Sequence, residues 1–258
     1  AIISLTEIIQ IGTGKMTLTI DGLTGGYGNL TILKDISFSV PSGKIVGLIG
    51  LNGAGKSTTI KHIIGLLTPQ AGTIDLDGKT LKTDPTGFRA SLAYVPETPV
   101  LYPELTLREH LDMTIMAYDL DKDTAWREAD AMLKRFRLDN KLDWFPAKFS
   151  KGMQQKVMIV AAFMTHAQLF IIDEPFTGLD PLAIHDLLDI VTAKKQQGAS
   201  VLMSTHILAT AQQYADEFVL IKSGKVRATG DMASLKQQFG LQDGSLDDIY
   251  MKMTEEKA

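Results

Sequence analysis

Residues 50–57 read GLNGAGKS, which is a complete G-x-x-x-x-G-K-S pattern. Its glycines allow backbone N–H groups to turn inward around a phosphate, because no Cβ stands in the way. Lys56 can reach the outer phosphates of a nucleotide, and the Ser57 hydroxyl can hold Mg²⁺. The stretch therefore predicts a phosphate-binding loop. Its expected nucleotide contacts are Asn52, Gly53, Ala54, Gly55, Lys56, Ser57 and Thr58.

The flanking residues fit a strand–loop–helix unit around this loop. Residues 44–49 form an apolar, β-branched run typical of a buried strand, and residues 58–64 have the spacing of a helix that ends near Gly65. The N-terminus of that helix would add its dipole to the anion site. A chance glycine-rich turn would not need all three parts, so we favour the phosphate-binding interpretation.

Length and composition narrow the possible classes of protein. The chain has 258 residues, a formal net charge of −4 and no cysteine. This length suits one large α/β domain or two small ones, and the lack of cysteine excludes disulfides, thiol catalysis and thiolate metal sites. The acidic balance argues against nucleic acid as a partner. No apolar stretch approaches the roughly 20 residues of a membrane helix, so a membrane role would require another chain to do the spanning.

Hydrophobic periodicity divides the chain into regions of different character. Strand patterns near the loop, with a hairpin signal at Asp77-Gly78, predict a small antiparallel sheet. These patterns lie at 17–21, 32–40 and 73–76. From residue 88 to about 145 the spacing is helical, and Thr106 with Glu109 matches a capping box. Strands and helices then alternate, which predicts an α/β fold with a mostly parallel, covered sheet. The alternating segments lie at 169–172, 182–197, 200–204 and 218–221.

The same patterns suggest three divisions of the chain. Residues 1–15 are expected to be an added leader before a native start at Met16, and a genuine extra strand is the alternative. Residues 16–240 would form the nucleotide-binding domain, with a helical subdomain inserted at about 88–156. Residues 241–258 would be a C-terminal helical extension packed on the domain's surface. Its predicted cap pairs Ser245 with Asp248, and its apolar face holds Leu246, Ile249, Tyr250 and Met253.

Two carboxylates follow an apolar run at residues 169–172. A buried strand there would deliver Asp173 and Glu174 at its carboxyl end, where ligands bind in open α/β sheets. Asp173 is placed to hold Mg²⁺ through its water shell. Glu174 can act as the general base that polarises an attacking water. An apolar strand that ends in acidic residues is common by itself. It indicates a nucleotide site here because a phosphate-binding loop precedes it in the chain.

The order of these motifs resembles the ATPase subunits of the ABC transporter family. A phosphate loop, a helical insert, the stretch FSKGMQQK at 149–156 and Asp173-Glu174 follow one another, and the likeness runs from Met16 to about residue 235. The resemblance implies an ABC-type P-loop ATPase with a flanking antiparallel β subdomain and an inserted helical subdomain. It also implies that Ser150 and Gly152 contact the γ-phosphate of ATP held by a second subunit. They would stand at the N-terminus of a helix, which can bind an anion.

Further residues carry over from the resemblance. Tyr27 resembles the aromatic residue that stacks on adenine, and a core tyrosine is the alternative. Asp180 ends a Gly178-Leu179-Asp180 loop similar to the one that couples the two sites of the dimer. His206 resembles the switch histidine that contacts the γ-phosphate and orients Glu174. We expect structural roles for the remaining histidines, which are His62, His110, His166 and His185.

The chain departs from the family pattern at two places. Glu97 stands where the family usually has a glutamine that meets Mg²⁺ and the water. A carboxylate can ligate Mg²⁺ more strongly than an amide, and it repels the γ-phosphate unless it is screened. We expect Glu97 to remain a metal-binding and catalytic residue. Lys151 and Met153 replace a usual Gly and Gln, and Lys151 either adds charge near the nucleotide or faces solvent.

Other stretches narrow the resemblance to the ATPase subunits of Ecs-type exporters, among them residues 97–107, 151–159 and 203–211. This implies ATP and Mg²⁺ as cofactors, a separate membrane-spanning permease, a head-to-tail homodimer with ATP, and a cytoplasmic location on the inner face of the membrane. A groove near Leu101, Tyr102 and Leu105 would take a short helix of the permease, or these residues simply pack in the core.

Two other functions remain open at this point. One is a soluble ABC ATPase acting on DNA, ribosomes or cluster assembly, although the chain lacks the sustained heptads and the second ATPase unit of the first two types. The other is a regulatory binder that holds ATP without turnover, which the presence of both Glu174 and His206 disfavours.

Overall fold

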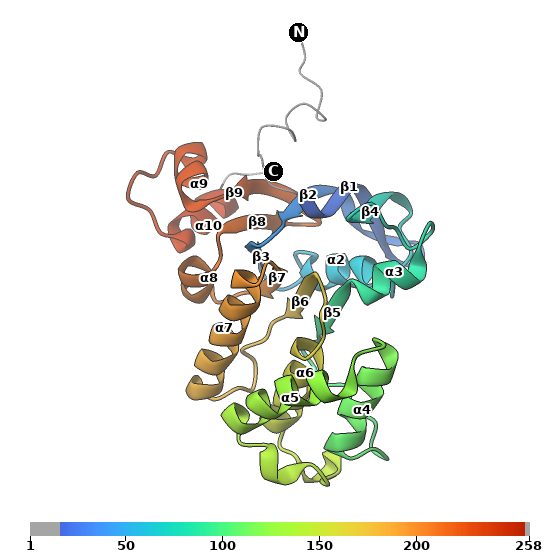
Figure 1. The fold of residues 1–258 in the computed structure, drawn as a ribbon. Coiled ribbons are helices and arrows are strands. Elements are labelled where there is room, and N and C mark those ends of the chain that lie inside the picture. The colour runs from blue at the N-terminus through green and yellow to red at the C-terminus, as the bar shows by residue number, and fades with distance from the viewer. Residues whose placement is uncertain (1–15, 256–258) are drawn as a thin grey trace.

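The computed structural model describes residues 16–255, and the predicted leader at 1–15 lies outside the described residues. Two sheets and a group of helices make up the described chain (Figure 1). The helices α4, α5 and α6 lie together on one side of the core sheet, and the small antiparallel sheet lies on the other (Figure 1). None of the helices described in residues 16–255 combines the length and the hydrophobicity of a membrane span.

The core sheet has the strand order β5-β6-β7-β3-β8-β9. All neighbours pair in parallel except β8 and β9, which are antiparallel. Its central strands are fully buried and mostly apolar, with polar residues at their ends, as expected for a parallel sheet covered on both faces. This confirms the predicted fold class. The strands are β3 (Ile45–Ile49), β5 (Leu92–Val95), β6 (Leu169–Asp173), β7 (Ser200–Thr205), β8 (Glu217–Lys222) and β9 (Lys225–Gly230).

The antiparallel sheet has the order β2-β1-β4. Its strands are β1 (Met16–Tyr27), β2 (Leu30–Pro41) and β4 (Ala71–Leu76). The predicted small antiparallel sheet is confirmed. The turn expected at Asp77-Gly78 is also present, since Leu76 and Lys79 exchange both backbone hydrogen bonds across it, but it closes only this isolated bridge, and β4 pairs along its length with β1. A local turn signal cannot show that a strand distant in sequence supplies the better partner.

The helical region differs from its prediction at its start. Residues 92–95, which the periodicity assigned to the helical insert, form the edge strand β5 of the core sheet. The four-residue strand is too short to show a period of its own. The capping box of α4 is confirmed, because the Thr106 hydroxyl accepts from the Glu109 N–H and the Glu109 carboxylate accepts from the Thr106 N–H. The helices of this region are α3 (Pro85–Ala90), α4 (Leu107–Ala117), α5 (Lys122–Phe136) and α6 (Lys151–Phe163), with short 3-10 turns at Asp139–Lys141 and Pro146–Lys148.

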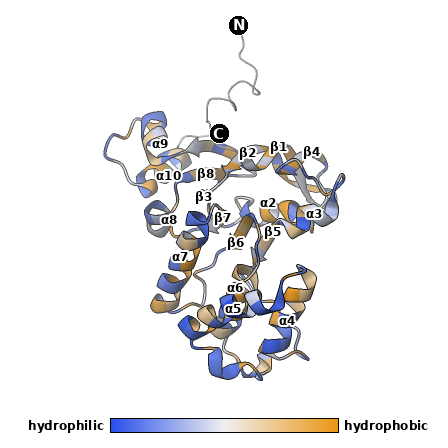
Figure 2. Cartoon of the chain, viewed as in Figure 1, coloured by the Kyte–Doolittle hydropathy of each residue, from blue (hydrophilic) through white to orange (hydrophobic). Residues whose placement is uncertain are grey.

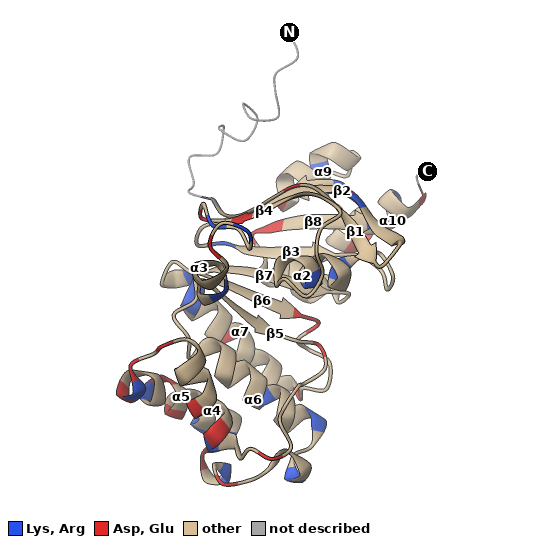
Figure 3. Ribbon diagram, turned by 90° about the vertical axis from the view of Figure 1, so that its right-hand side faces the viewer, with Lys and Arg blue, Asp and Glu red and all other residues tan. Residues whose placement is uncertain are grey.

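The other helices lie along the core sheet. They are α2 (Lys56–Ile63), α7 (Pro181–Gln196), α8 (Leu208–Tyr214), α9 (Met232–Phe239) and α10 (Leu246–Glu255). Hydrophobic and hydrophilic residues alternate along α4, α5 and α7 (Figure 2), which is typical of helices that bury one face. Acidic and basic residues are interspersed over the helical region (Figure 3).

The C-terminal helices complete a hydrophobic cluster against the core sheet. The predicted apolar face of α10 is buried and packs with residues of β3, β8, α8 and α9. The Ser245–Asp248 cap is present, with the Ser245 N–H donating to the Asp248 carboxylate at 2.8 Å. The chain after residue 240 therefore shares its packing with the strand that leads into the phosphate loop.

Candidate functional site

Four neighbouring parallel strands end at the same edge of the core sheet. They are β5, β6, β7 and β3, in this spatial order. The residues that follow their carboxyl ends are Glu97, Glu174, His206 and the phosphate loop, although these are far apart in sequence. Because ligands bind beyond the carboxyl ends of strands in such sheets, this edge is the candidate site.

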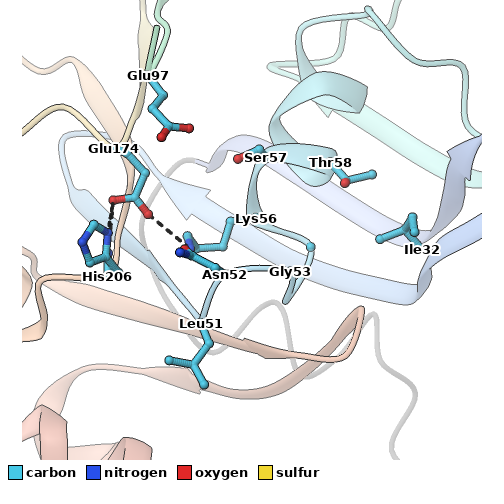
Figure 4. A pocket seen from close by; sticks show the side chains of 11 residues that line it. Ile32, Leu51, Asn52, Gly53, Lys56, Ser57, Thr58, Glu97, Glu174 and His206 are labelled. Atoms are coloured by element: carbon cyan, nitrogen blue, oxygen red, sulfur yellow. Dashed lines mark hydrogen bonds and ion pairs between the residues drawn. The ribbon is translucent and has the colours of Figure 1, made fainter. Parts of the chain in front are cut away.

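The phosphate loop lines a cavity of about 420 Å³ at this edge. Gly55, at φ 115°, takes a backbone conformation that favours glycine, and α2 begins at the next residue. The free N–H groups at the start of α2 thus face the cavity as an anion site. Its lining residues are Ile32, Leu51, Asn52, Gly53, Gly55, Lys56, Ser57, Thr58, Glu97, Glu174 and His206 (Figure 4). Ala54 is buried beside them.

Lys56, Glu174 and His206 meet inside this cavity (Figure 4). The Lys56 side chain is only 5% exposed, and its Nζ lies 3.2 Å from Glu174 Oε1. The same ammonium donates to the Gly50 carbonyl at 2.8 Å. His206 Nδ1 lies 2.7 Å from the other Glu174 oxygen, Oε2. The carboxylate of Glu174 therefore neutralises the buried lysine charge where the phosphates of a nucleotide would otherwise do so.

Ser204 positions both acids, although no sequence motif pointed to it. Its hydroxyl donates to Asp173 Oδ1 and accepts from the Glu174 backbone N–H at 3.0 Å. The parallel register places Asp173 directly beside Ser204. Glu174 itself has φ 46°, in the left-handed region, so the chain turns sharply at the end of β6. A buried hydroxyl near the end of an apolar strand was the available signal for this role.

The residues present fit Mg²⁺ bound together with a nucleotide. The Ser57 hydroxyl lies 3.4 Å from Asp173 Oδ1, so two oxygen donors of the kind Mg²⁺ prefers converge beside the phosphate loop. Among residues 16–255, no group of three or more His, Cys, Asp or Glu side chains could hold a metal by itself.

Glu97 and Tyr27 occupy different places relative to the cavity. Glu97 is exposed and lines it, across from Ser57 (Figure 4). Tyr27 is 45% exposed and is not among the residues that line it. The Tyr27 hydroxyl accepts a hydrogen bond from Lys61 Nζ at 3.0 Å, and this bond lowers the pKa of the phenol. The alternative of a core tyrosine is wrong, since the ring remains accessible.

The predicted signature residues lie away from this cavity in the same chain. Ser150 caps α6 by accepting from the Met153 N–H at 3.3 Å. A Cβ on Gly152 would lie 2.5 Å from the Gly178 carbonyl oxygen, so the start of α6 packs directly on the loop before α7. The Asp180 carboxylate in that loop caps α7 and pairs with Lys156 of α6 at 2.9 Å. Lys151 is exposed.

The comparisons with known proteins agree with this geometry. The ABC transporter family model matches residues 33–177. The chain belongs to the ABC transporter family, and it is of the ATP-binding type that hydrolyses ATP.

Individual relatives show which ATP-binding proteins of the family this chain is similar to. The chain is 56% identical to the ABC-type transporter ATP-binding protein EcsA of Bacillus subtilis (strain 168), over 93% of this chain and 98% of that protein. It is 40% identical to the uncharacterized ABC transporter ATP-binding protein YthP of the same organism, over 86% and 89% of the two chains. A solved ATP-binding subunit of an ABC transporter matches with a TM-score of 0.90 and 52% identity, over 93% of this chain and 100% of that one. The predicted resemblance to the EcsA type is thus confirmed.

Proposed function

We propose that this protein is the motor subunit of an export-type ABC transporter, in which binding and hydrolysis of ATP power a separate membrane-spanning permease. The observation that carries the proposal is the convergence of Lys56, Glu174 and His206 at the phosphate loop. The 56% identity to EcsA supports an Ecs-like role. The protein would work in the cytoplasm, on the inner face of the membrane.

The chemistry of turnover follows from the contacts of Glu174. An incoming ATP would offer its phosphates to Lys56, which now pairs with Glu174 Oε1 at 3.2 Å. Glu174 would then be free to accept the proton of an attacking water as general base. His206 holds the other carboxylate oxygen and would keep Glu174 oriented toward that water. Ser57 and Asp173, together with Glu97, are the residues that would hold Mg²⁺, which when bound would supply positive charge to the phosphates.

The positions of the signature residues favour a dimer. Ser150, Gly152 and Asp180 do not line the cavity of their own chain. A second subunit, placed head to tail, would bring its Ser150 and Gly152 to the γ-phosphate, where a hydroxyl and free N–H groups at a helix start form an anion cap. The pair of Lys156 and Asp180 would keep the start of α6 and the coupling loop moving as one unit.

An apolar hollow on the helical region is the proposed docking surface for the permease. Of the three residues named from the sequence, Leu105 lines this hollow, whereas Leu101 packs against the core. Met116 is 81% exposed there, without a partner in the described residues that would explain so large an apolar side chain at the surface. The lining residues are Leu105, Glu109, Asp112, Met113, Met116 and Ala117.

Light scattering with nucleotide tests the proposed motor. We expect Glu174→Gln to double in mass with Mg²⁺ and ATP and to lose turnover, because it retains the binding groups and lacks the base. Lys56→Ala, which lacks the phosphate-binding ammonium, is the matched control and should remain monomeric. A Glu174→Gln variant that binds ATP and stays monomeric would contradict the dimer, and one that hydrolyses ATP at the wild-type rate would contradict the assigned base.

A further inference from the structure

The C-terminal helix reaches the phosphate loop through one tyrosine. Tyr250 of α10 is 5% exposed, and its hydroxyl accepts the backbone N–H of Leu51 at 2.7 Å. Leu51 is the second residue of the phosphate loop and lies 199 positions earlier in the chain. Burial raises the pKa of the Tyr250 phenol, so the group remains a neutral hydroxyl at physiological pH. The loop thus has an anchor outside the strand and helix that flank it.

A second contact holds the other half of the loop. The Gly224 N–H, in the turn between β8 and β9, donates to the Ala54 carbonyl at 2.9 Å. Lys222, at the end of β8, donates from Nζ to the carbonyls of Met253 and Thr254 at 3.3 and 3.0 Å. These carbonyls belong to the last turn of α10, where a lysine favourably meets the helix dipole. The turn that holds Ala54 is therefore tied to the same helix that holds Leu51.

We infer that α10 is a brace for the phosphate loop and that Tyr250 is a positioning residue for ATP binding. The inference rests on the proposed ATP site and adds to it a residue that does not touch the nucleotide. A loop already held in its phosphate-binding conformation loses less freedom when ATP binds, so binding is tighter. Because the brace acts equally on bound ATP and on the transition state, its loss weakens binding rather than slowing the chemical step.

Tyr250→Phe tests this brace, because it removes one hydroxyl and keeps the buried ring. We expect the Kd for ATP in EDTA and the KM for ATP to rise about two- to tenfold, as for the loss of one intramolecular hydrogen bond, with the effect on kcat/KM carried by KM. Amide hydrogen exchange in the peptide 50–57 should become faster. Tyr118→Phe is the matched control, since its hydroxyl donates to the Leu92 carbonyl at 2.9 Å, away from the loop, and its ATP affinity should stay unchanged.

Lys222→Met provides a second measurement that leaves the Tyr250 hydroxyl in place. It should also speed exchange in the peptide 50–57, because the turn at Gly224 loses its tie to α10. The brace is overturned if both variants keep wild-type exchange and ATP affinity while the wild type binds ATP. A wild-type protein that fails to bind ATP would instead overturn the proposed ATP site, so the two failures are distinguishable.

Discussion

The ion pair between Lys56 and Glu174 makes a prediction about stability without nucleotide. Both side chains are buried, at 5% and 8% exposure, and within residues 16–255 the Lys56 ammonium has only Gly50 O as its other partner. Glu174→Gln keeps an oxygen acceptor but removes the negative charge. Leaving a buried charge without its ion-pair partner costs about 1–3 kcal/mol or more, so we expect the free energy of unfolding to fall by roughly 1.5–3 kcal/mol.

The consequence appears in thermal unfolding. At about 2–4 °C per kcal/mol for a domain of this size, the variant should melt roughly 3–12 °C below the wild type. ATP would supply the missing negative charge to Lys56, so saturating ATP should narrow the difference through linkage. Scanning calorimetry in EDTA measures both states without requiring turnover. With Mg²⁺ present, kcat should fall by about 10²–10⁴-fold, the usual contribution of a general base.

A matched control distinguishes the ATP-dependent destabilisation of Glu174→Gln from the general effect of removing a carboxylate in an ion pair. Glu128→Gln breaks an ion pair with Lys194 of 3.1 Å that lies away from the cavity. ATP should not change the difference between its melting temperature and that of the wild type. If Glu174→Gln melts with the wild type in the absence of nucleotide, or if its deficit persists unchanged in saturating ATP, then the pairing of Lys56 does not have the proposed role.

Three further predictions concern other residues of the site. Glu97→Gln should raise the Mg²⁺ concentration needed for half-maximal ATP hydrolysis by up to about tenfold, because a charge-assisted contact is worth roughly 1.5 kcal/mol. An unchanged Mg²⁺ titration would show that Glu97 is not part of the metal site. Ser204→Ala should lower the free energy of unfolding by about 1–3 kcal/mol, because the buried Asp173 loses a hydrogen-bond donor. Chemical denaturation measures this, and a denaturation midpoint equal to that of the wild type would contradict the positioning role of Ser204. The hydrogen bond from Lys156 lowers the pKa of Asp180 below its ordinary 3.8. The stability that the Asp180 carboxylate contributes is therefore fully present above about pH 4, and it is lost as the pH falls through the lowered pKa of the folded state. Asp180→Asn should therefore lose about 1 kcal/mol or less at pH 7. Its difference from the wild type should shrink as the pH falls below 4, and unfolding curves that differ equally at pH 7 and at acidic pH would contradict this.

Secondary structure was predictable from the sequence where a hydrophobic pattern was long, or where the stabilising contacts joined neighbouring residues. The capping boxes before α4 and α10 and the apolar run of β6 needed only neighbouring residues to be recognised. The short strand β5 was assigned to the helical region, and the turn signal after β4 did not indicate that β1 is its partner. In both cases a pairing between distant segments outweighed the local signal, because a strand is stabilised by the neighbours it finds in the sheet.

The sequence by itself determined the chemistry of this protein. Its glycine-rich loop, its paired acids and the order in which these follow one another were sufficient to indicate an ATP-binding member of the ABC family, since a phosphate loop needs only a few residues in a row. Only the tertiary structure decided how these groups meet: the ion pair of Lys56 with Glu174, the support of both acids by Ser204, and the contact of Tyr250 with Leu51. Such contacts join segments more than a hundred residues apart or strands adjacent only in the sheet, and they follow from packing and register, which no local pattern records.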